Sequence, residues 1–156
     1  MKTFNGLISE LKENQVFVFG SNINGFHGGG SAGFAFRDKS HVGSVKQGTI
    51  GKWCVWGIGE GYQKGLHGNS YALPTIDEEM ESLSLEQIKS SIEKFYKFAE
   101  ENPDKEFLVA YTTSNPHLIC GYSIYEMSDC FASFRIPENV VFEEEFNKLV
   151  YDINNI

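Results

Sequence analysis

One stretch constrains the fold of this chain more than any other: "VFVFGSNINGFHGGGSAGFAF", residues 16–36, which contains six glycines. Its first four residues, Val16–Phe19, are a continuous apolar run and predict a strand buried on both faces. Ser31 follows the glycine run and is expected to cap a short helix that extends to about Asp38. A buried strand, a glycine-rich loop and a helix in this order are typical of an α/β protein.

The rest of the chain alternates between the same two kinds of element. Two capping boxes predict helix starts at Ser84, with Gln87 three residues on, and at Ser123, with Glu126. Asn102-Pro103 is expected to end the first of these helices. Further strands are expected at 53–56, 70–75, 106–113 and 139–142, and a closing helix at 143–153. This order predicts one α/β domain, residues 1–156, with a mostly parallel sheet.

Charge and cysteine content restrict the partners and the compartment. The net charge is −8, whereas a protein that grips a duplex through many phosphate contacts is basic, so duplex DNA or RNA is not an expected partner. The three cysteines, Cys54, Cys120 and Cys130, are widely spaced and favour a reducing compartment. The sequence lacks a membrane-length apolar run and a signal-peptide core, which predicts a cytoplasmic protein.

The sequence gives no sign of a metal or a cofactor. The four histidines, His27, His41, His67 and His117, lack metal-ligand spacing with cysteines or carboxylates. Neither a Walker A loop nor the GxGxxG fingerprint is present. The glycine-rich segment 57–61 is expected to form a flexible flap.

Two strand–loop–helix junctions are candidates for a ligand site. In a parallel sheet, the loop 20–30 and the loop 113–122 both leave the carboxyl ends of strands, where ligands bind in this class. Each junction offers unpaired N–H groups to an anion, and two facing junctions would suit a diphosphate. Gly28, Gly29 and Gly30 would let the main chain approach phosphate oxygens. Glycines also make tight turns, so packing and ligand binding both remain open for this run.

Three side chains are candidates for acid–base chemistry. Asp77 follows a strand end in "PTID", where a carboxylate can meet a ribose hydroxyl or activate a water, although a turn-forming role is the alternative. His27 and Asn24 are the other candidate general bases, because a base must reach the attacked site or its water.

These motifs together resemble the macro domain, and in particular its divergent bacterial and phage macro-like branch. Asn22 stands six residues before Gly28-Gly29-Gly30, and "SAGFAF" follows where the family has a short helix. The segment "ICGYSIYEM" is similar to the family's second loop, with Gly121 and Tyr122 in place. "GNSYALPTID" is similar to the strand and turn of the macro-like branch. The resemblance spans most of residues 15–135.

The resemblance implies a three-layer α/β/α domain that binds ADP-ribose or a related NAD-derived nucleotide. By matching positions, Asn22 would hold the distal ribose, Gly28–Ser31 would line the pyrophosphate, and Ser114–Tyr122 would wrap its other side. The full predicted ligand set is Gly20, Ser21, Asn22, Asn24, Gly28, Gly29, Gly30, Ser31, Thr75, Asp77, Ser114, Asn115, His117, Leu118, Gly121 and Tyr122.

Two departures from the family pattern bear on function. Ala32 occupies the position of the acidic residue that de-ADP-ribosylating members carry, and Leu118 replaces a glycine in the second loop. A binding module is therefore the first hypothesis, and a hydrolase that removes or processes ADP-ribose is the second. The third is a non-enzymatic phage or bacterial accessory protein, with Phe26, Trp53 and Trp56 as contact anchors unless they pack in the core. The oligomeric state is left open.

Overall fold

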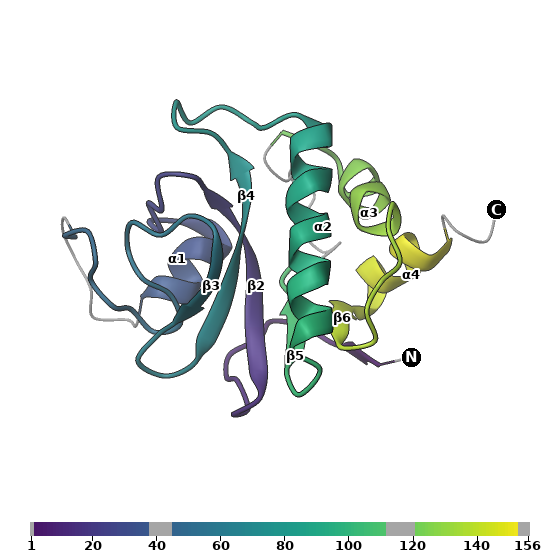
Figure 1. Ribbon diagram of the computed structural model, residues 1–156, viewed down its shortest axis with the longest axis horizontal. Helices are drawn as coiled ribbons and strands as arrows, with labels where there is room; N and C mark the ends of the chain where they lie inside the picture. The colour runs from purple at the N-terminus through teal and green to yellow at the C-terminus, as the bar shows by residue number, and fades with distance from the viewer. Residues whose placement is uncertain (1, 38–44, 112–120, 153–156) are drawn as a thin grey trace.

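A computed structural model of the chain describes residues 2–37, 45–111 and 121–152, and this part contains six strands and four helices (Figure 1). The strands form one mixed sheet in the order β1-β6-β5-β2-β4-β3, with only the β3–β4 pair antiparallel. The fold is α/β with three layers, as expected. The elements in chain order are β1 Thr3–Phe4, β2 Gln15–Asn22, α1 Gly30–Phe36, β3 Gly61–Lys64, β4 Asn69–Ile76, α2 Leu85–Glu101, β5 Glu106–Val109, α3 Ile124–Ala132, β6 Val140–Glu143 and α4 Glu144–Asp152.

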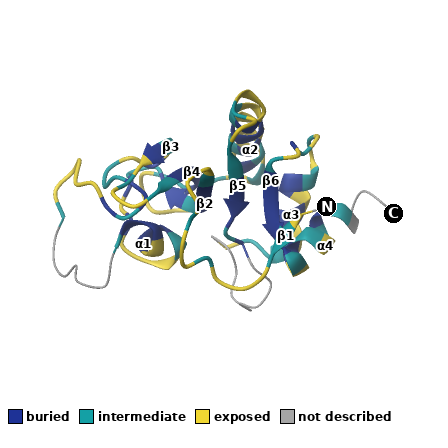
Figure 2. Cartoon of the chain, turned by 90° about the horizontal axis from the view of Figure 1, so that it is seen from below, coloured by how far each residue is buried: buried dark blue, intermediate teal, exposed yellow. Residues whose placement is uncertain are grey.

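Strand β2 shows how the sheet separates two cores. Side chains alternate along a strand, so Val16 and Val18 join the core that α2, α3 and α4 cover, while Phe17 and Phe19 join the core beneath α1. All four side chains are buried. Figure 2 shows the same division, with buried strands between α1 on one side and α2 on the other.

The larger core is built on the apolar stripe of α2. Ile88, Ile92 and Phe95 are fully buried on this stripe and pack with Phe131 of α3 and Phe146 of α4. Each such side chain contributes about 1.5–3 kcal/mol through its removal from water. This half of the molecule is therefore the scaffold that holds the strand ends in place.

Both predicted capping boxes are confirmed. The Gln87 amide donates to Ser84 Oγ at 3.2 Å, and the Glu126 amide donates to Ser123 Oγ at 3.1 Å. In each box the long side chain also accepts from the amide of the capping serine. Local chemistry alone sets these two helix starts.

The short helix after the glycine run is confirmed as α1, but its predicted cap and the predicted strand at 53–56 are wrong. Ser31 does not cap α1, because the Gly33 amide already bonds to the Gly29 carbonyl at 2.9 Å and Gly29 is the N-cap. Residues 53–56 form turns with one isolated bridge, Ile50 to Val55, rather than a strand. The reason is tertiary: the Trp53 amide donates to the Ala35 carbonyl of α1 at 2.8 Å, and the Val55 amide donates to Gln63 Oε1 at 2.7 Å.

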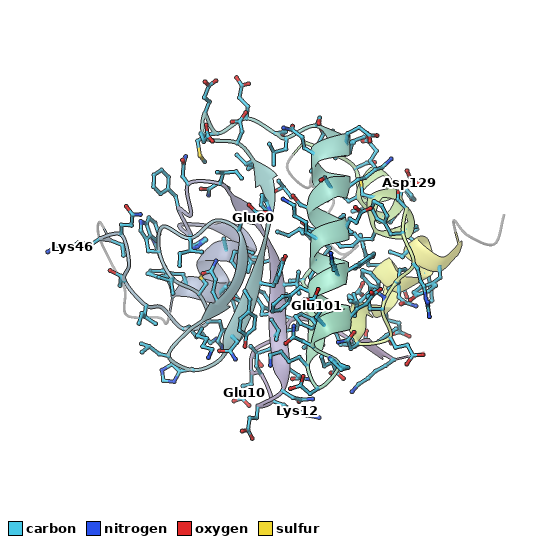
Figure 3. The ribbon with its side chains drawn as sticks, viewed as in Figure 1. Glu10, Lys12, Lys46, Glu60, Glu101 and Asp129 are labelled. Atoms are coloured by element: carbon cyan, nitrogen blue, oxygen red, sulfur yellow. The ribbon has the colours of Figure 1, made fainter. Side chains whose placement is uncertain are left out.

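The amino-terminal end of the sheet is tied by charged groups. Lys2 Nζ donates to Glu106 Oε2 at 2.6 Å, and Gln15 Nε2 donates to Glu106 Oε1 at 2.9 Å. Glu10 and Lys12 project from the molecule at the same end (Figure 3). Within the described residues, no helix has the length and apolar character needed to cross a membrane.

Candidate functional site

The carboxyl ends of three neighbouring strands meet at one edge of the sheet. β2 pairs in parallel with β4 on one side and with β5 on the other, so the loops that follow all three strands begin at this edge. The Ile23 amide bonds to the Ile76 carbonyl at 3.0 Å and joins two of these loops directly. The predicted ligand residues Ser114, Asn115, His117 and Leu118 lie outside the described residues.

The glycine run Gly28–Gly30 is exposed, and neither Gly28 nor Gly29 has a steric reason to lack a side chain. A Cβ built at Gly29 or Gly30 meets nothing within 4 Å, and one at Gly28 meets only Trp56, at 4.0 Å. By contrast, a Cβ at Gly25 or Gly59 would collide with the main chain of a neighbouring loop. Internal packing therefore explains the glycines at positions 25 and 59 but not Gly28 or Gly29. Gly30 is explained by its backbone conformation, because its φ is +59°.

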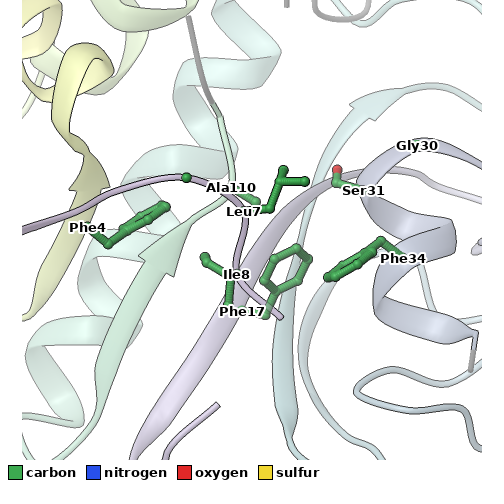
Figure 4. Close-up of a pocket in the computed structure, with 9 residues that line it drawn as sticks. Phe4, Leu7, Ile8, Phe17, Gly30, Ser31, Phe34 and Ala110 are labelled. Atoms are coloured by element: carbon green, nitrogen blue, oxygen red, sulfur yellow. The ribbon is translucent and has the colours of Figure 1, made fainter. Parts of the chain in front are cut away.

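An apolar pocket borders the run. Its volume is about 270 Å³, and it lies between α1, Phe17 of β2, Ala110 just after β5, and β1 with the segment that follows it (Figure 4). Gly30 and Ser31 line it at the side of the glycine run. The remaining walls are mostly apolar and comprise Phe4, Gly6, Leu7, Ile8, Phe17, Phe34 and Ala110. A cavity of this kind beside exposed main-chain amides can accept a flat apolar group attached to an anion.

Sequence reasoning missed this pocket. Phe4, Leu7 and Ile8 reach it because β1 pairs with β6 from the far end of the chain. The two-residue strand β1 carries too short a pattern to be predicted. The local sequence indicated only part of the pocket wall: Phe34 follows Ser31 by three residues, a spacing that places both on one face of α1.

The predicted polar residues of the β2 loop are engaged within the protein. Asn22 Oδ1 accepts from the Phe26 amide at 3.0 Å, and Asn22 Nδ2 donates to the Phe26 carbonyl at 2.9 Å. Ser21 Oγ donates to the Gly59 carbonyl, and Asn24 Nδ2 donates to the Glu78 carbonyl at 3.0 Å. These side chains shape the loop, and their role toward a ligand stays a prediction.

Gly20 is explained by packing. A Cβ at this position would lie 2.9 Å from Tyr111 Oη and 3.5 Å from Thr75 Oγ1. Thr75 is itself buried and donates to the Ser21 carbonyl at 3.3 Å. Gly20 and Thr75 thus form the floor beneath the loops.

His27 lies in the core rather than at a reactive position. Its side chain is fully buried, with Nε2 2.8 Å from the Ile58 carbonyl, and Nδ1 has no hydrogen-bond partner among the described residues. Phe19 contacts the ring edge-on at 5.4 Å, and Trp56 does so at 6.2 Å. Burial lowers the pKa of His27, so the neutral ring donates from Nε2 and holds the glycine loop against residues 55–59.

The segment 57–61 is packed rather than a flap. The Gly57 amide bonds to the Gly25 carbonyl at 2.9 Å, and the Ile58 carbonyl accepts from Gln63 Nε2 at 2.7 Å as well as from His27. The expectation of a flap was wrong because composition shows glycines but not the close backbone contact that requires them.

Asp77 stabilises a turn. Its Oδ1 accepts from the amides of Glu79 at 2.9 Å and Glu81 at 3.0 Å, and its own amide donates to the Glu81 carbonyl at 2.7 Å. This is the turn-forming alternative stated for Asp77. The same turn contains Met80, whose φ is 65°.

Gly121 and Tyr122 lie beside the loop that follows β4. Tyr122 Oη donates to the Leu83 carbonyl at 2.6 Å, and a Cβ at Gly121 would lie 3.1 Å from Ser82 Oγ. Gly121 and Tyr122, the described residues of the second predicted junction, therefore contact the loop that follows β4. Among the residues that the structure describes, no three histidine, cysteine or acidic side chains gather as metal ligands.

Of the predicted contact anchors, Trp53 is in the core. It is 1% exposed and packs on Phe17 with ring centroids 4.9 Å apart, which confirms the alternative of core packing for this residue. Phe26 remains 52% exposed and stacks on the partly buried Trp56 at 6.0 Å.

Comparison with known proteins gives no matching protein-family model and no matching curated protein. The function is therefore argued from the geometry of this site.

Proposed function

We propose that the chain binds ADP-ribose or a related NAD-derived nucleotide. The observation that carries this proposal is the exposed run Gly28–Gly30, whose main chain carries no side chains although packing leaves room for them at Gly28 and Gly29. Backbone amides in such a run can hold phosphate oxygens without a basic side chain. A net charge of −8 therefore does not exclude a small nucleotide.

The pocket beside the run supplies the second part of the proposal. A nucleotide joins a flat, largely apolar base to charged phosphates, and the site offers an apolar cavity of about 270 Å³ with Gly30 and Ser31 at its edge. In this arrangement the base enters the cavity and the diphosphate lies along the glycine run. The resemblance to the macro domain assigns the other side of the diphosphate to residues 114–122, and that assignment stays a prediction.

The state of the candidate bases favours binding over hydrolysis. Asp77 Oδ1 already accepts two backbone hydrogen bonds, His27 is fully buried, and Asn24 Nδ2 is bonded to the Glu78 carbonyl. A general base must reach the attacked site or its water. Asp77 and Asn24 instead bond to the backbone of the β4 loop, and His27 is enclosed in the core. We therefore prefer a binding module to an ADP-ribose hydrolase.

Calorimetric titration of the whole chain tests the proposal. ADP-ribose should bind at one site, ADP more weakly, and ribose 5-phosphate more weakly again, because each step removes part of the contact with the run or the pocket. Ligand at a hundred times its Kd should stabilise the fold by about 2.7 kcal/mol and raise Tm by roughly 5–11 °C. Absence of heat and of a Tm shift with ADP-ribose and with ADP would refute the proposal.

A further inference from the structure

An exposed aromatic pair stands beside the glycine run. Phe26 and Trp56 stack with ring centroids 6.0 Å apart and planes 25° from parallel, and Phe26 is 52% exposed. Trp56 is fixed from below by an edge-on contact with Phe36 at 5.2 Å. The main chain of Phe26 is held at both its amide and its carbonyl by Asn22. The pair is thus a positioned surface that presents an aromatic ring to solvent.

The pair and the apolar pocket lie at opposite ends of the same three glycines. Trp56 Cη2 is 4.0 Å from the position of a Cβ on Gly28, whereas Gly30 lines the pocket. The run therefore connects two places that suit flat rings: a half-open apolar pocket at Gly30 and an exposed aromatic surface at Gly28.

We infer that Phe26, backed by Trp56, is a second ring-binding subsite, and that the ligand is a dinucleotide with two heteroaromatic rings joined through a central diphosphate. This inference rests on the proposed function and narrows its ligand class. Aromatic side chains stack on flat heterocycles of any sequence, and Phe26 can do so without moving a packed neighbour. A cationic ring such as nicotinamide would gain further attraction from the face of the phenyl ring.

Paired titrations with NAD+ and ADP-ribose test the inference, because the two ligands differ by the nicotinamide ring alone. The wild-type chain should bind NAD+ more tightly than ADP-ribose. Phe26→Ala should weaken NAD+ binding by at least about fivefold, the lower range for loss of one base–aromatic stack, and change ADP-ribose binding by less than about twofold. Leu66→Ala removes another large exposed apolar side chain, 67% exposed, and should change neither affinity.

The outcomes separate this inference from the proposed function. Equal weakening of both ligands by Phe26→Ala, or no weakening of NAD+, would overturn the second subsite while leaving nucleotide binding intact. Failure of the wild-type chain to bind either ligand would overturn both. Phe26→Leu, with Tm measured alongside, guards against a folding defect: it should retain the wild-type Tm and still discriminate less between the two ligands. A wild-type ratio of affinities in Phe26→Leu would count against stacking.

Discussion

Replacement of Gly29 by aspartate separates the packing role of the glycine run from its binding role. Gly29 is the N-cap of α1, with φ −150° and ψ 176°, and no side chain caps this helix. These angles are extended backbone that any residue adopts, and a Cβ there meets nothing within 4 Å. The fold therefore tolerates a side chain at position 29. A phosphate bound to the glycine run would not tolerate a negatively charged side chain there.

The expected effects on stability and on binding have opposite signs. Aspartate is preferred over glycine as an N-cap by a few tenths of a kcal/mol, and loss of a glycine restricts the unfolded chain by about 0.4–1 kcal/mol. Gly29→Asp should therefore gain about 1 kcal/mol of stability and raise Tm by roughly 2–4 °C. A carboxylate about 4 Å from a phosphate is repelled by about 1 kcal/mol in water and about 4 kcal/mol near a protein surface, so the Kd for ADP-ribose should rise by roughly 5- to 1000-fold.

Gly29→Asn is the matched control, because asparagine caps helices as well as aspartate does and has the same shape without the charge. Calorimetry with ADP-ribose should show a smaller loss of affinity for Gly29→Asn than for Gly29→Asp. The difference between the two variants should shrink as salt is added. If both folded variants bind ADP-ribose with the wild-type Kd, the glycine run does not contact the ligand and the reasoning fails.

Three further predictions concern His27, Asp77 and Ser84. Burial lowers the pKa of His27 in the folded state, so as the pH falls the unfolded chain takes up a proton before the folded protein does. The free energy of unfolding in urea should therefore have its full value above the unfolded pKa of about 6.5. It should decrease as the pH falls from there through the folded pKa. That loss should disappear in His27→Gln, and its persistence would assign it to another group. Asp77→Ala removes the acceptor of two backbone hydrogen bonds and should lower the free energy of unfolding in urea by about 1–3 kcal/mol. The variant should bind ADP-ribose as the wild type does. A loss of affinity without a loss of stability would instead place Asp77 at the ligand. Ser84→Ala breaks the capping box of α2 and should cost about 1 kcal/mol, so an unchanged unfolding midpoint would show that the cap contributes nothing.

Features set by local chemistry were predictable from the sequence. The helices that begin after Ser84 and Ser123 start where their capping boxes place them. The apolar runs gave β2 and β4, although both strands extend beyond the predicted residues. Each of these features depends on residues a few positions apart, and a single sequence contains that information.

Features set by distant contacts were not predictable. Segment 53–56 has the composition of a strand, but the Trp53 amide bonds to the Ala35 carbonyl of α1 and the Val55 amide bonds to the Gln63 side chain. His27 was a candidate base from its place in the glycine-rich loop, but residues far along the chain enclose it. Its Nε2 lies 2.8 Å from the Ile58 carbonyl. The pocket beside the run depends on β1 pairing with β6. In each case the decisive neighbour is fixed by tertiary packing.

The central claim is that the amides of Gly28–Gly30 hold the phosphates of a nucleotide, and backbone amide NMR shifts during titration with ADP-ribose test it most directly. We predict saturable shifts that are largest at Gly28, Gly29, Gly30 and Ser31. Saturable binding with these four amides unmoved, or no shift anywhere at millimolar ADP-ribose, would contradict the claim.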